Sequence, residues 1–369
     1  MSAELPSEAH EFRSFPRVLL LSCVFGMVAI GTDMYLPAMP AMGAAFGVDA
    51  QDIQLSLSVF IASNACGQLL FGPISDRFGR RPVLLVGIVV YGVTSFICAM
   101  TAELSTFLAA RALQGLSGAS GPVLVRAMIN DRLSKIDAAK TLALLTGLMA
   151  FIAMLTPILA GFMVRFGSWE IVFYFMSGLA LALALSCLTA LKETLPPRLR
   201  VAKLDLPGLL EVYGTILRTP QFWVYTTTPG LLFAGVFAYV GTNSYLLIEH
   251  VGLEESRHGV TYAVAAFAYV LGSFTSHRIV EKLGIDQTIV VGLGMNIVGA
   301  LLAAAASSAL ELSLWLIVVP GVVAFYTTAI VVPVAVSRAV GIFPRSGGSA
   351  SALAGFIQLL ISGAGTVVE

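Results

Sequence analysis

Long apolar runs separated by short charged segments constrain this chain more than any other feature. A helix of about twenty apolar residues spans the hydrocarbon core of a bilayer, and lipid offers no partners for free backbone groups. The chain of 369 residues is 57% hydrophobic and only 11% charged, which leaves too little polar surface for a soluble globule of this size. We therefore expect an all-α polytopic membrane protein.

The apolar runs predict eleven spans, six before and five after a charged, proline-bearing stretch. The spans lie at 18–37, 53–72, 83–101, 107–128, 141–164, 171–191, 222–247, 259–280, 288–307, 312–336 and 349–368. We accordingly expect an N-terminal bundle at 1–191, a cytoplasmic linker at 192–218 and a C-terminal bundle at 219–369.

Lysine and arginine residues outside the predicted spans fall almost entirely on one side of the membrane. Only Arg165 and Arg257 fall on the other side, where the loops carry acidic residues instead. Because basic residues accumulate in cytoplasmic loops, this pattern predicts a cytoplasmic N-terminus.

The segment 72–82, GPISDRFGRRP, joins the second and third predicted spans. Its glycines and prolines tend to end or interrupt helices, so we expect a short cytoplasmic hairpin here. Three arginines suit an inside loop, and a pure topology signal explains them equally well. Asp76, however, can accept hydrogen bonds from guanidinium groups or from a helix N-terminus. The loop is therefore a candidate conformational latch, formed by Gly72, Asp76, Arg77, Gly79, Arg80 and Arg81.

Three motifs carry a resemblance to a known family. The spacing G-x-x-S-D-R-x-G-R-R in the loop resembles the signature between helices 2 and 3 of the major facilitator superfamily, and the residues from Arg111 to Gly115 resemble its R-x-x-Q-G element. The segment 33–40, DMYLPAMP, resembles the D-x-Y-L-P-x-x-P element of the Bcr/CflA branch of drug:proton antiporters, which includes chloramphenicol, florfenicol and bicyclomycin exporters. The resemblance implies the major facilitator fold of two six-helix bundles, of which this chain would lack the last helix.

The fifth predicted span resembles the glycine-proline motif of antiporters through Gly147, Pro157 and Gly161. The match is imperfect, because Thr156 and Ala160 stand where that pattern has glycine. Helix packing by small residues with a proline kink is the alternative interpretation.

Asp33 and Arg111 are ionisable residues within the predicted spans, where a charge is costly enough to indicate function. Arginine stays protonated in proteins, so Asp33 is the candidate proton carrier and Arg111 would modulate it. The alternatives are an interfacial carboxylate at Asp33 and a structural charge at Arg111, bonded to backbone carbonyls or to Gln114.

Polar and aromatic side chains within the spans are candidate substrate contacts. Asn64 and Gln68 lie one helical turn apart, and each serves interhelical hydrogen bonding equally well. Aromatic residues can wall an apolar cavity, although most aromatics in such helices pack or face lipid. The candidate substrate-binding residues are Asp33, Tyr35, Phe60, Asn64, Gln68, Tyr239, Asn243 and Phe267.

With the resemblance, these features predict proton-coupled efflux of lipophilic or amphipathic antibiotics, of phenicol type among others, across the bacterial inner membrane by alternating access. The expected partners are small-molecule drugs, protons and the lipid bilayer, in a monomer that binds no nucleic acid. We find no catalytic motif or metal-ligand cluster in the sequence, so we expect neither enzyme activity nor a cofactor, only the proton motive force. A proton-coupled uptake symporter for a small metabolite is the alternative.

Overall fold

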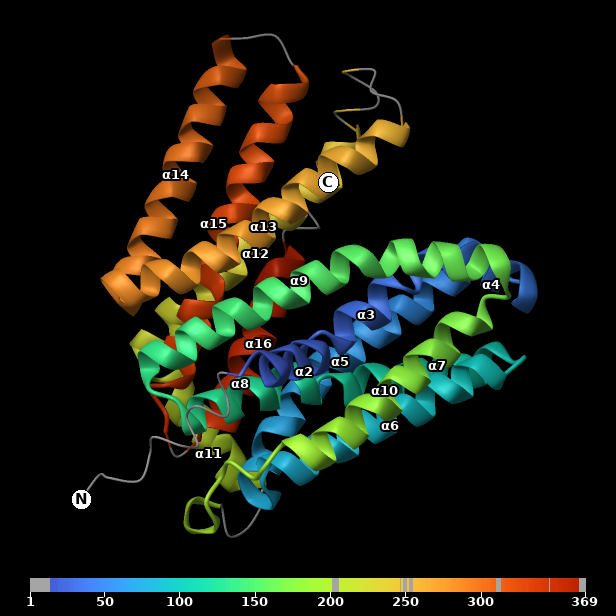
Figure 1. Cartoon of the computed structure of the whole chain (residues 1–369), viewed down its shortest axis with the longest axis horizontal. Coiled ribbons are helices and arrows are strands. Elements are labelled where there is room, and N and C mark those ends of the chain that lie inside the picture. Colours follow the sequence, from blue (N-terminus) through green and yellow to red (C-terminus); the bar gives the residue numbers. More distant parts are fainter. Residues whose placement is uncertain are drawn as a thin grey trace. The chain divides into compact units, whose positions relative to one another are not determined.

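The computed structural model describes residues 14–200, 206–245, 247, 251, 255–309, 313–344 and 346–364, and over these residues it contains helices and no strands. Each predicted span overlaps one or more of its helices. The helices are α2 (Phe15–Phe25), α3 (Met27–Asp33), η1 (Leu36–Ala38), α4 (Met39–Phe46), α5 (Ala50–Phe78), α6 (Arg80–Met100), α7 (Leu104–Gly118), α8 (Ser120–Arg132), α9 (Lys135–Phe166), α10 (Glu170–Ala190), η2 (Pro197–Leu199), α11 (Leu206–Leu217), α12 (Pro220–Tyr245), α13 (Glu255–Leu283), α14 (Ile285–Ala309), α15 (Leu314–Val340) and α16 (Gly347–Ala364) (Figure 1).

Seven of the described helices are long and apolar enough to cross a membrane, and α2 with Met27–Ala38 forms an eighth if its 51° bend lies within one span. The other predicted spans fall on α7 and α8, which are separated at Ala119, on α12 and on the shorter α16. The prediction of an all-α polytopic membrane protein is confirmed, whereas the count of eleven spans stays a prediction.

The predicted hairpin at 72–82 is wrong in its extent. Helix α5 continues through Pro73 to Phe78 and α6 begins at Arg80, so Gly79 alone separates them. The φ of Gly79 is +100°, a backbone conformation that favours glycine because other residues clash there through Cβ. The turn is therefore a single residue long.

A distant tyrosine compensates for the donor that α5 lacks at Pro73. Proline has no N–H, so the carbonyl of Leu69, four residues earlier, loses its donor within the helix. The Tyr213 hydroxyl of α11 donates to this carbonyl instead, at 2.5 Å. Burial also raises the pKa of Tyr213.

The chain divides into two compact units, and each is described by itself. Unit 1 comprises Met1–Arg132, Ile152–Ile216 and Phe343–Phe356, and unit 2 comprises Leu133–Phe151, Leu217–Ile342 and Ile357–Glu369. The predicted bundles at 1–191 and 219–369, with a linker between them, stay a prediction.

In unit 1, α5 packs against α7, while α6 packs against α7 and α10. The crossing of α5 and α7 is close because a Cβ at Gly115 would collide with the backbone of Phe60. An aromatic cluster adds to this core, and its Phe107 and Phe173 rings meet edge to face with centroids 5.5 Å apart. The cluster consists of Tyr35, Phe46, Phe107, Trp169 and Phe173.

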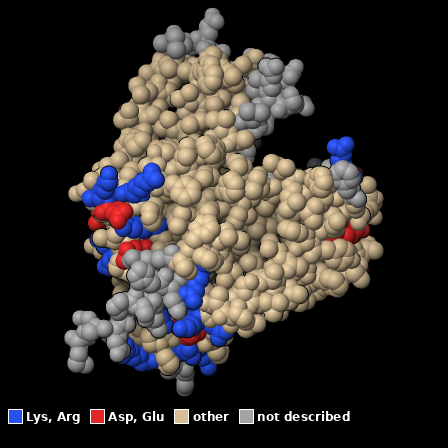
Figure 2. Space-filling model, in the orientation of Figure 1, with Lys and Arg blue, Asp and Glu red and all other residues tan. Residues whose placement is uncertain are grey.

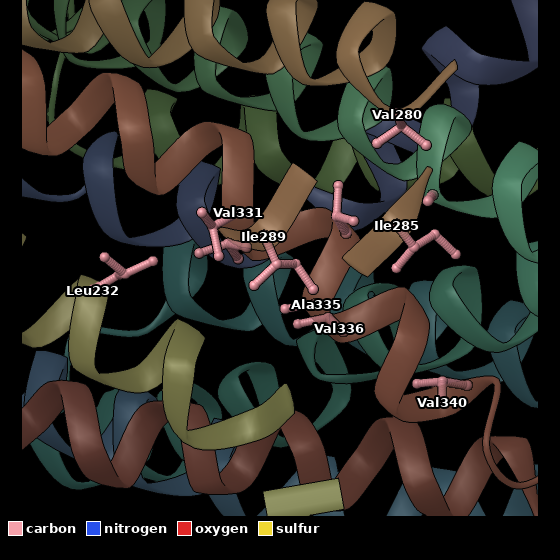
Figure 3. Close-up of a cluster of buried hydrophobic side chains, with 11 residues drawn as sticks. Leu232, Val280, Ile285, Ile289, Val331, Ala335, Val336 and Val340 are labelled. Carbon is pink, nitrogen blue, oxygen red and sulfur yellow. The ribbon is translucent and has the colours of Figure 1, made fainter. Parts of the chain in front are cut away.

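In unit 2, α15 packs against α12, α13 and α14. Figure 3 shows the buried cluster that joins them, with Leu232 from α12, Val280 from α13, Ile289 from α14 and Val331 and Ala335 from α15. Because α15 has neighbours on several sides, its sequence is apolar almost without interruption.

The outer surface is apolar as well. Figure 2 shows one face on which most of the surface carries neither basic nor acidic side chains, and the charged ones gather in a few places. Large apolar side chains are exposed on the helices, among them Val290 at 69% and Trp315 at 70%. Apolar surface of this extent suits contact with lipid.

Candidate functional site

Asp76 joins two helices near the end of α5, where it is 3% exposed. Its Oδ1 accepts a hydrogen bond from Arg80 Nη1 at 2.5 Å. Its Oδ2 accepts the backbone N–H of Ser349 at 3.1 Å and the Ser349 hydroxyl at 2.7 Å. Ser349 lies in the first turn of α16, so the carboxylate satisfies a free N–H there and complements the helix dipole. A guanidinium and a helix N-terminus, the two partners that the sequence indicates for Asp76, are both present.

Arg80 is 1% exposed and lies between two carboxylates. Besides Asp76, it bonds to Asp131 at the end of α8, with 3.0 Å between Nε and Oδ2. The same Asp131 oxygen accepts from the Thr194 hydroxyl at 3.2 Å, and Arg80 Nη1 also donates to the Ser75 hydroxyl at 2.7 Å. Two carboxylates and a hydroxyl offset the desolvation of a buried guanidinium.

Glu193 holds the start of α6 in place. Its carboxylate accepts the backbone N–H of Arg80 at 3.0 Å and that of Arg81 at 3.3 Å, groups that have no acceptor within the helix at its first turn. A Cβ at Gly79 would collide with this carboxylate. Arg81 itself reaches the Leu188 carbonyl with Nη2 at 2.6 Å.

Sequence reasoning missed several of these partners. They are Asp131, Glu193, Tyr213 and Ser349. The available signal was an acidic residue within three positions of the end of a predicted span, which is present for both Asp131 and Glu193 but does not identify a partner.

The other latch residues differ in role. A Cβ at Gly72 would lie 2.5 Å from the Gly348 carbonyl oxygen, so the backbones of α5 and α16 approach closely at this glycine pair. Arg77 is half-buried, with its guanidinium 5.0 Å from the Phe78 ring centroid. Arg77 takes no part in the hydrogen bonds that Asp76 forms with Arg80 and Ser349. The latch function of the whole segment stays a prediction.

Arg111 of α7 is fully buried in a cage of aromatic rings. Its Cζ lies 4.2 Å from the ring centroid of Phe60, 4.6 Å from that of Tyr35 and 5.9 Å from that of Phe173. Ring faces attract a cation, and most strongly where water is excluded. The cage therefore stabilises the guanidinium without a carboxylate.

Arg111 also has polar neighbours. Nη1 donates to Gln114 Oε1 at 2.7 Å and to the Gly31 carbonyl at 3.4 Å, and Gln114 in turn donates to the Ser95 hydroxyl at 2.6 Å. Nε and Nη2 have no hydrogen-bond partner among the described residues. The contacts expected of a structural charge are thus present, and the coupling role stays a prediction.

Asp33 is the last residue of α3 and is half-buried. Its Oδ1 accepts the Thr32 hydroxyl at 3.2 Å. Over the ranges that the structure describes, Asp33 forms no ion pair, with Arg111 or with any other base. The expected influence of Arg111 on Asp33 is therefore not a direct contact in this conformation.

The candidate substrate contacts of unit 1 are engaged with neighbouring helices. The Tyr35 hydroxyl donates to the Ile53 carbonyl at 2.7 Å. Asn64 Nδ2 donates to the Gly115 carbonyl at 3.1 Å, and Gln68 Nε2 donates to Asn64 Oδ1 at 3.3 Å. Asn64 thus links α5 to α7, as the interhelical alternative predicts.

The candidate substrate contacts of unit 2 form fewer contacts with neighbouring helices. Tyr239 stacks edge to face on Phe325 at 6.3 Å between centroids, and its buried hydroxyl finds no partner in the described part of the chain. Phe267 is 52% exposed. Asn243 lies in α12, and its side chain is outside the described residues. The eight candidates are therefore divided between the two units, and their substrate role stays a prediction.

The antiporter-like stretch lies in α9, which is continuous through Pro157. A Cβ at Gly147 would lie 2.8 Å from Ser273 Cβ, so this glycine allows close packing of α9 on α13 within unit 2. Gly161 has open space beside it, and the Pro157 side chain is outside the described residues. Packing by small residues explains Gly147 and leaves Gly161 without a structural reason.

Comparison with known proteins identifies the family. Residues 21–366 match the family model described as Major Facilitator Superfamily. The chain belongs to the major facilitator superfamily. The crystal structure of the superfamily transporter FucP in the outward conformation has the same fold, with a TM-score of 0.74 over 97% of this chain and 91% of that one at 12% identity. The prediction of the major facilitator fold is confirmed.

Three relatives indicate the branch of the superfamily to which the chain is similar. It is 31% identical to the uncharacterised transporter YdgK of Bacillus subtilis over 70% of its own length and 66% of YdgK. It is 25% identical to a bicyclomycin resistance protein homolog of Haemophilus influenzae, over 94% of this chain and 87% of that protein. It is 31% identical to a chloramphenicol resistance protein of Pseudomonas aeruginosa, over 78% of this chain and 67% of that protein.

The chain therefore spans just under two thirds of the length of YdgK. The named relatives support the Bcr/CflA branch that the element at 33–40 resembles. Membership in a family of transporters also speaks against an intramembrane enzyme.

Proposed function

We propose that this protein exports small lipophilic or amphipathic antibiotics in exchange for protons. It would work by alternating access in the bacterial inner membrane, as a monomer with a cytoplasmic N-terminus, driven by the proton motive force alone. The observation that carries this proposal is the half-buried Asp33, a carboxyl group within a predicted span and without a basic partner in the described residues, in an element that resembles one of drug exporters.

Asp33 has the chemistry that coupling requires. A proton carrier must be neutral when it faces one side of the membrane and ionised when it faces the other. A carboxyl group does this when its surroundings alternate between apolar and wet. Its hydrogen-bond partner in this conformation is the neutral Thr32 hydroxyl, so no fixed charge holds Asp33 ionised.

Arg111 would act as the fixed charge that Asp33 senses. It keeps its proton in proteins, and its aromatic cage holds it in place without a counter-ion. Tyr35 supplies one ring of this cage and lies two residues after Asp33 in the chain. A shift of the Asp33–Tyr35 segment would therefore change the separation of the carboxyl group and the guanidinium.

The contacts around Asp76 would control access from the cytoplasm. They tie the end of α5 to Ser349 of α16 and to Arg80 of α6 through charge-assisted hydrogen bonds, which are stronger than neutral ones. An inward-open state would require these bonds to break. The substrate class rests on the relatives, two of which are named for resistance to bicyclomycin and chloramphenicol.

Inside-out membrane vesicles from an exporter-deficient bacterium test the proposal. With the vesicle interior acidified, a proton-exchanging exporter accumulates chloramphenicol, and Asp33→Asn abolishes this accumulation. An uptake symporter moves its substrate out of such vesicles instead. Absence of proton-dependent accumulation by the parent protein would reject drug:proton exchange.

A further inference from the structure

Arg126 is another cation buried in unit 1, and none of the contacts above involves it. It lies in α8 within the predicted span 107–128 and is 7% exposed. Its Nε donates to the Pro122 carbonyl at 2.6 Å, and its Cζ lies 5.7 Å from the Phe25 ring centroid. Across the residues that the structure describes, its two terminal nitrogens form no hydrogen bond and no ion pair.

This arrangement differs from that of the other buried arginines. Arg80 has two carboxylates, and Arg111 has a cage of three rings and the Gln114 amide. Arg126 has one carbonyl of its own helix and one distant ring. A buried cation without a counter-charge is strongly unfavourable, and within a membrane span it indicates a function.

A second unsatisfied polar group lies beside Arg126. At Gly355 of α16, a Cβ would lie 2.9 Å from Arg126 Nη2 and would collide with Gln68 Oε1. Gln68 is 4% exposed, and this oxygen has no hydrogen-bond partner within the described ranges. Because Gly355 has no side chain, the free guanidinium edge of Arg126 and the free amide oxygen of Gln68 both lie beside it.

We propose that Arg126 binds a carboxylate carried by the transported molecule, and that Gln68 accepts a hydrogen bond from a neighbouring N–H or O–H of the same molecule. Because Nε is already bonded to Pro122, the two terminal nitrogens form the free edge. This edge can donate two parallel hydrogen bonds to the two oxygens of one carboxylate. The inference rests on the proposed transport function and extends it to acidic substrates.

Binding of two matched probes to the full chain, purified in detergent, tests this inference. The probes are 2-naphthoate and its neutral amide, 2-naphthamide, which share the ring and differ in charge. The parent protein should bind the carboxylate at least about tenfold more tightly in calorimetry, because hydrogen bonds to charged groups contribute about 1.5–3 kcal/mol. Equal affinities in the parent overturn the inference.

Variants separate recognition from structure. Arg126→Gln should remove the preference for 2-naphthoate and leave 2-naphthamide binding unchanged, whereas Arg126→Lys, which keeps the charge without the planar fork, should retain part of it. The control is Arg165→Gln at the exposed end of α9, which removes one positive charge and should keep the full preference. Equal losses for both probes in Arg126→Gln would make Arg126 a structural residue.

Two further measurements keep these outcomes distinct. Gel filtration and melting temperature establish that each variant is folded, and Arg126→Lys decides the question if Arg126→Gln does not fold. Proton-driven accumulation of chloramphenicol is scored separately in vesicles. Its absence in the parent would reject drug:proton exchange, while the carboxylate preference measured in detergent would still decide the role of Arg126.

Discussion

The backbone N–H of Ser349 donates to the Asp76 carboxylate at 3.1 Å, across 273 residues of sequence. This bond joins the end of α5 to the first turn of α16 within unit 1. One carboxylate thereby serves as the acceptor for a helix start and as the counter-ion of the buried Arg80. Loss of its charge affects both contacts at once.

Asp76→Asn should stop transport without preventing membrane insertion or drug binding. The amide oxygen can still accept from Ser349, but the charge-assisted bond to Arg80 is lost. At about 1.5–3 kcal/mol for such a bond, the balance between conformations shifts by about one to two powers of ten. Chloramphenicol efflux from cells, corrected for protein amount, measures the effect, with Asp49→Asn at an exposed site as control. Normal efflux by Asp76→Asn would leave the segment 72–82 as a topology signal only.

Glu193→Gln should weaken the start of α6. The substitution removes the charge that faces the N–H groups of Arg80 and Arg81, and loss of a helix cap costs about 0.5–2 kcal/mol. We expect a lower melting temperature and weaker transport. Glu211→Gln, at an exposed position of α11, removes the same charge and should change neither. An unchanged melting temperature in Glu193→Gln would show that the cap contributes little.

Asp33→Asn should abolish proton-coupled efflux while the protein still inserts and binds neutral drugs. Asparagine cannot take up or release a proton, so drug-induced proton release from purified protein should disappear. The measurement is a pH-indicator signal on adding chloramphenicol in detergent. Asp52→Asn, an exposed carboxylate of α5, should release protons like the parent. Proton release by Asp33→Asn at the parental level would assign the carrier to another residue.

Arg111→Lys should behave more like Arg111→Ala than like the parent. The guanidinium lies over the rings of Phe60 and Tyr35 while Nη1 reaches Gln114, and a single ammonium cannot satisfy both the planar stacking and the directional bond. Efflux activity at equal protein amounts compares the three proteins. Substantial activity in Arg111→Lys would show that charge alone suffices.

The sequence allowed the membrane class, the family and the chemistry of several residues to be predicted. The charge and position of Asp76 indicated its two kinds of partner, because a buried carboxylate seeks a cation or free N–H groups. No local pattern indicated that Ser349 supplies the N–H, since a contact across 273 residues depends on helix packing.

The low helix propensity of proline did not end the helix at Pro73. Proline and glycine indicated a loop, yet α5 continues through Pro73, and Tyr213 supplies the donor that proline lacks. Exposure of aromatic residues was equally unpredictable. Phe267 is 52% exposed whereas Phe60 is fully buried, although both lie in apolar helices whose sequences do not distinguish a lipid-facing side from a packed one.

The cap that Glu193 provides has a consequence for protein engineering. The N–H groups that follow the turn at Gly79 bond to a carboxylate that lies 113 residues further along the chain from Arg80. A chimera that receives only residues 72–82 from this protein would therefore acquire the motif without the acceptor for these N–H groups. Transplanting the turn in working form requires the segment after α10 to travel with it.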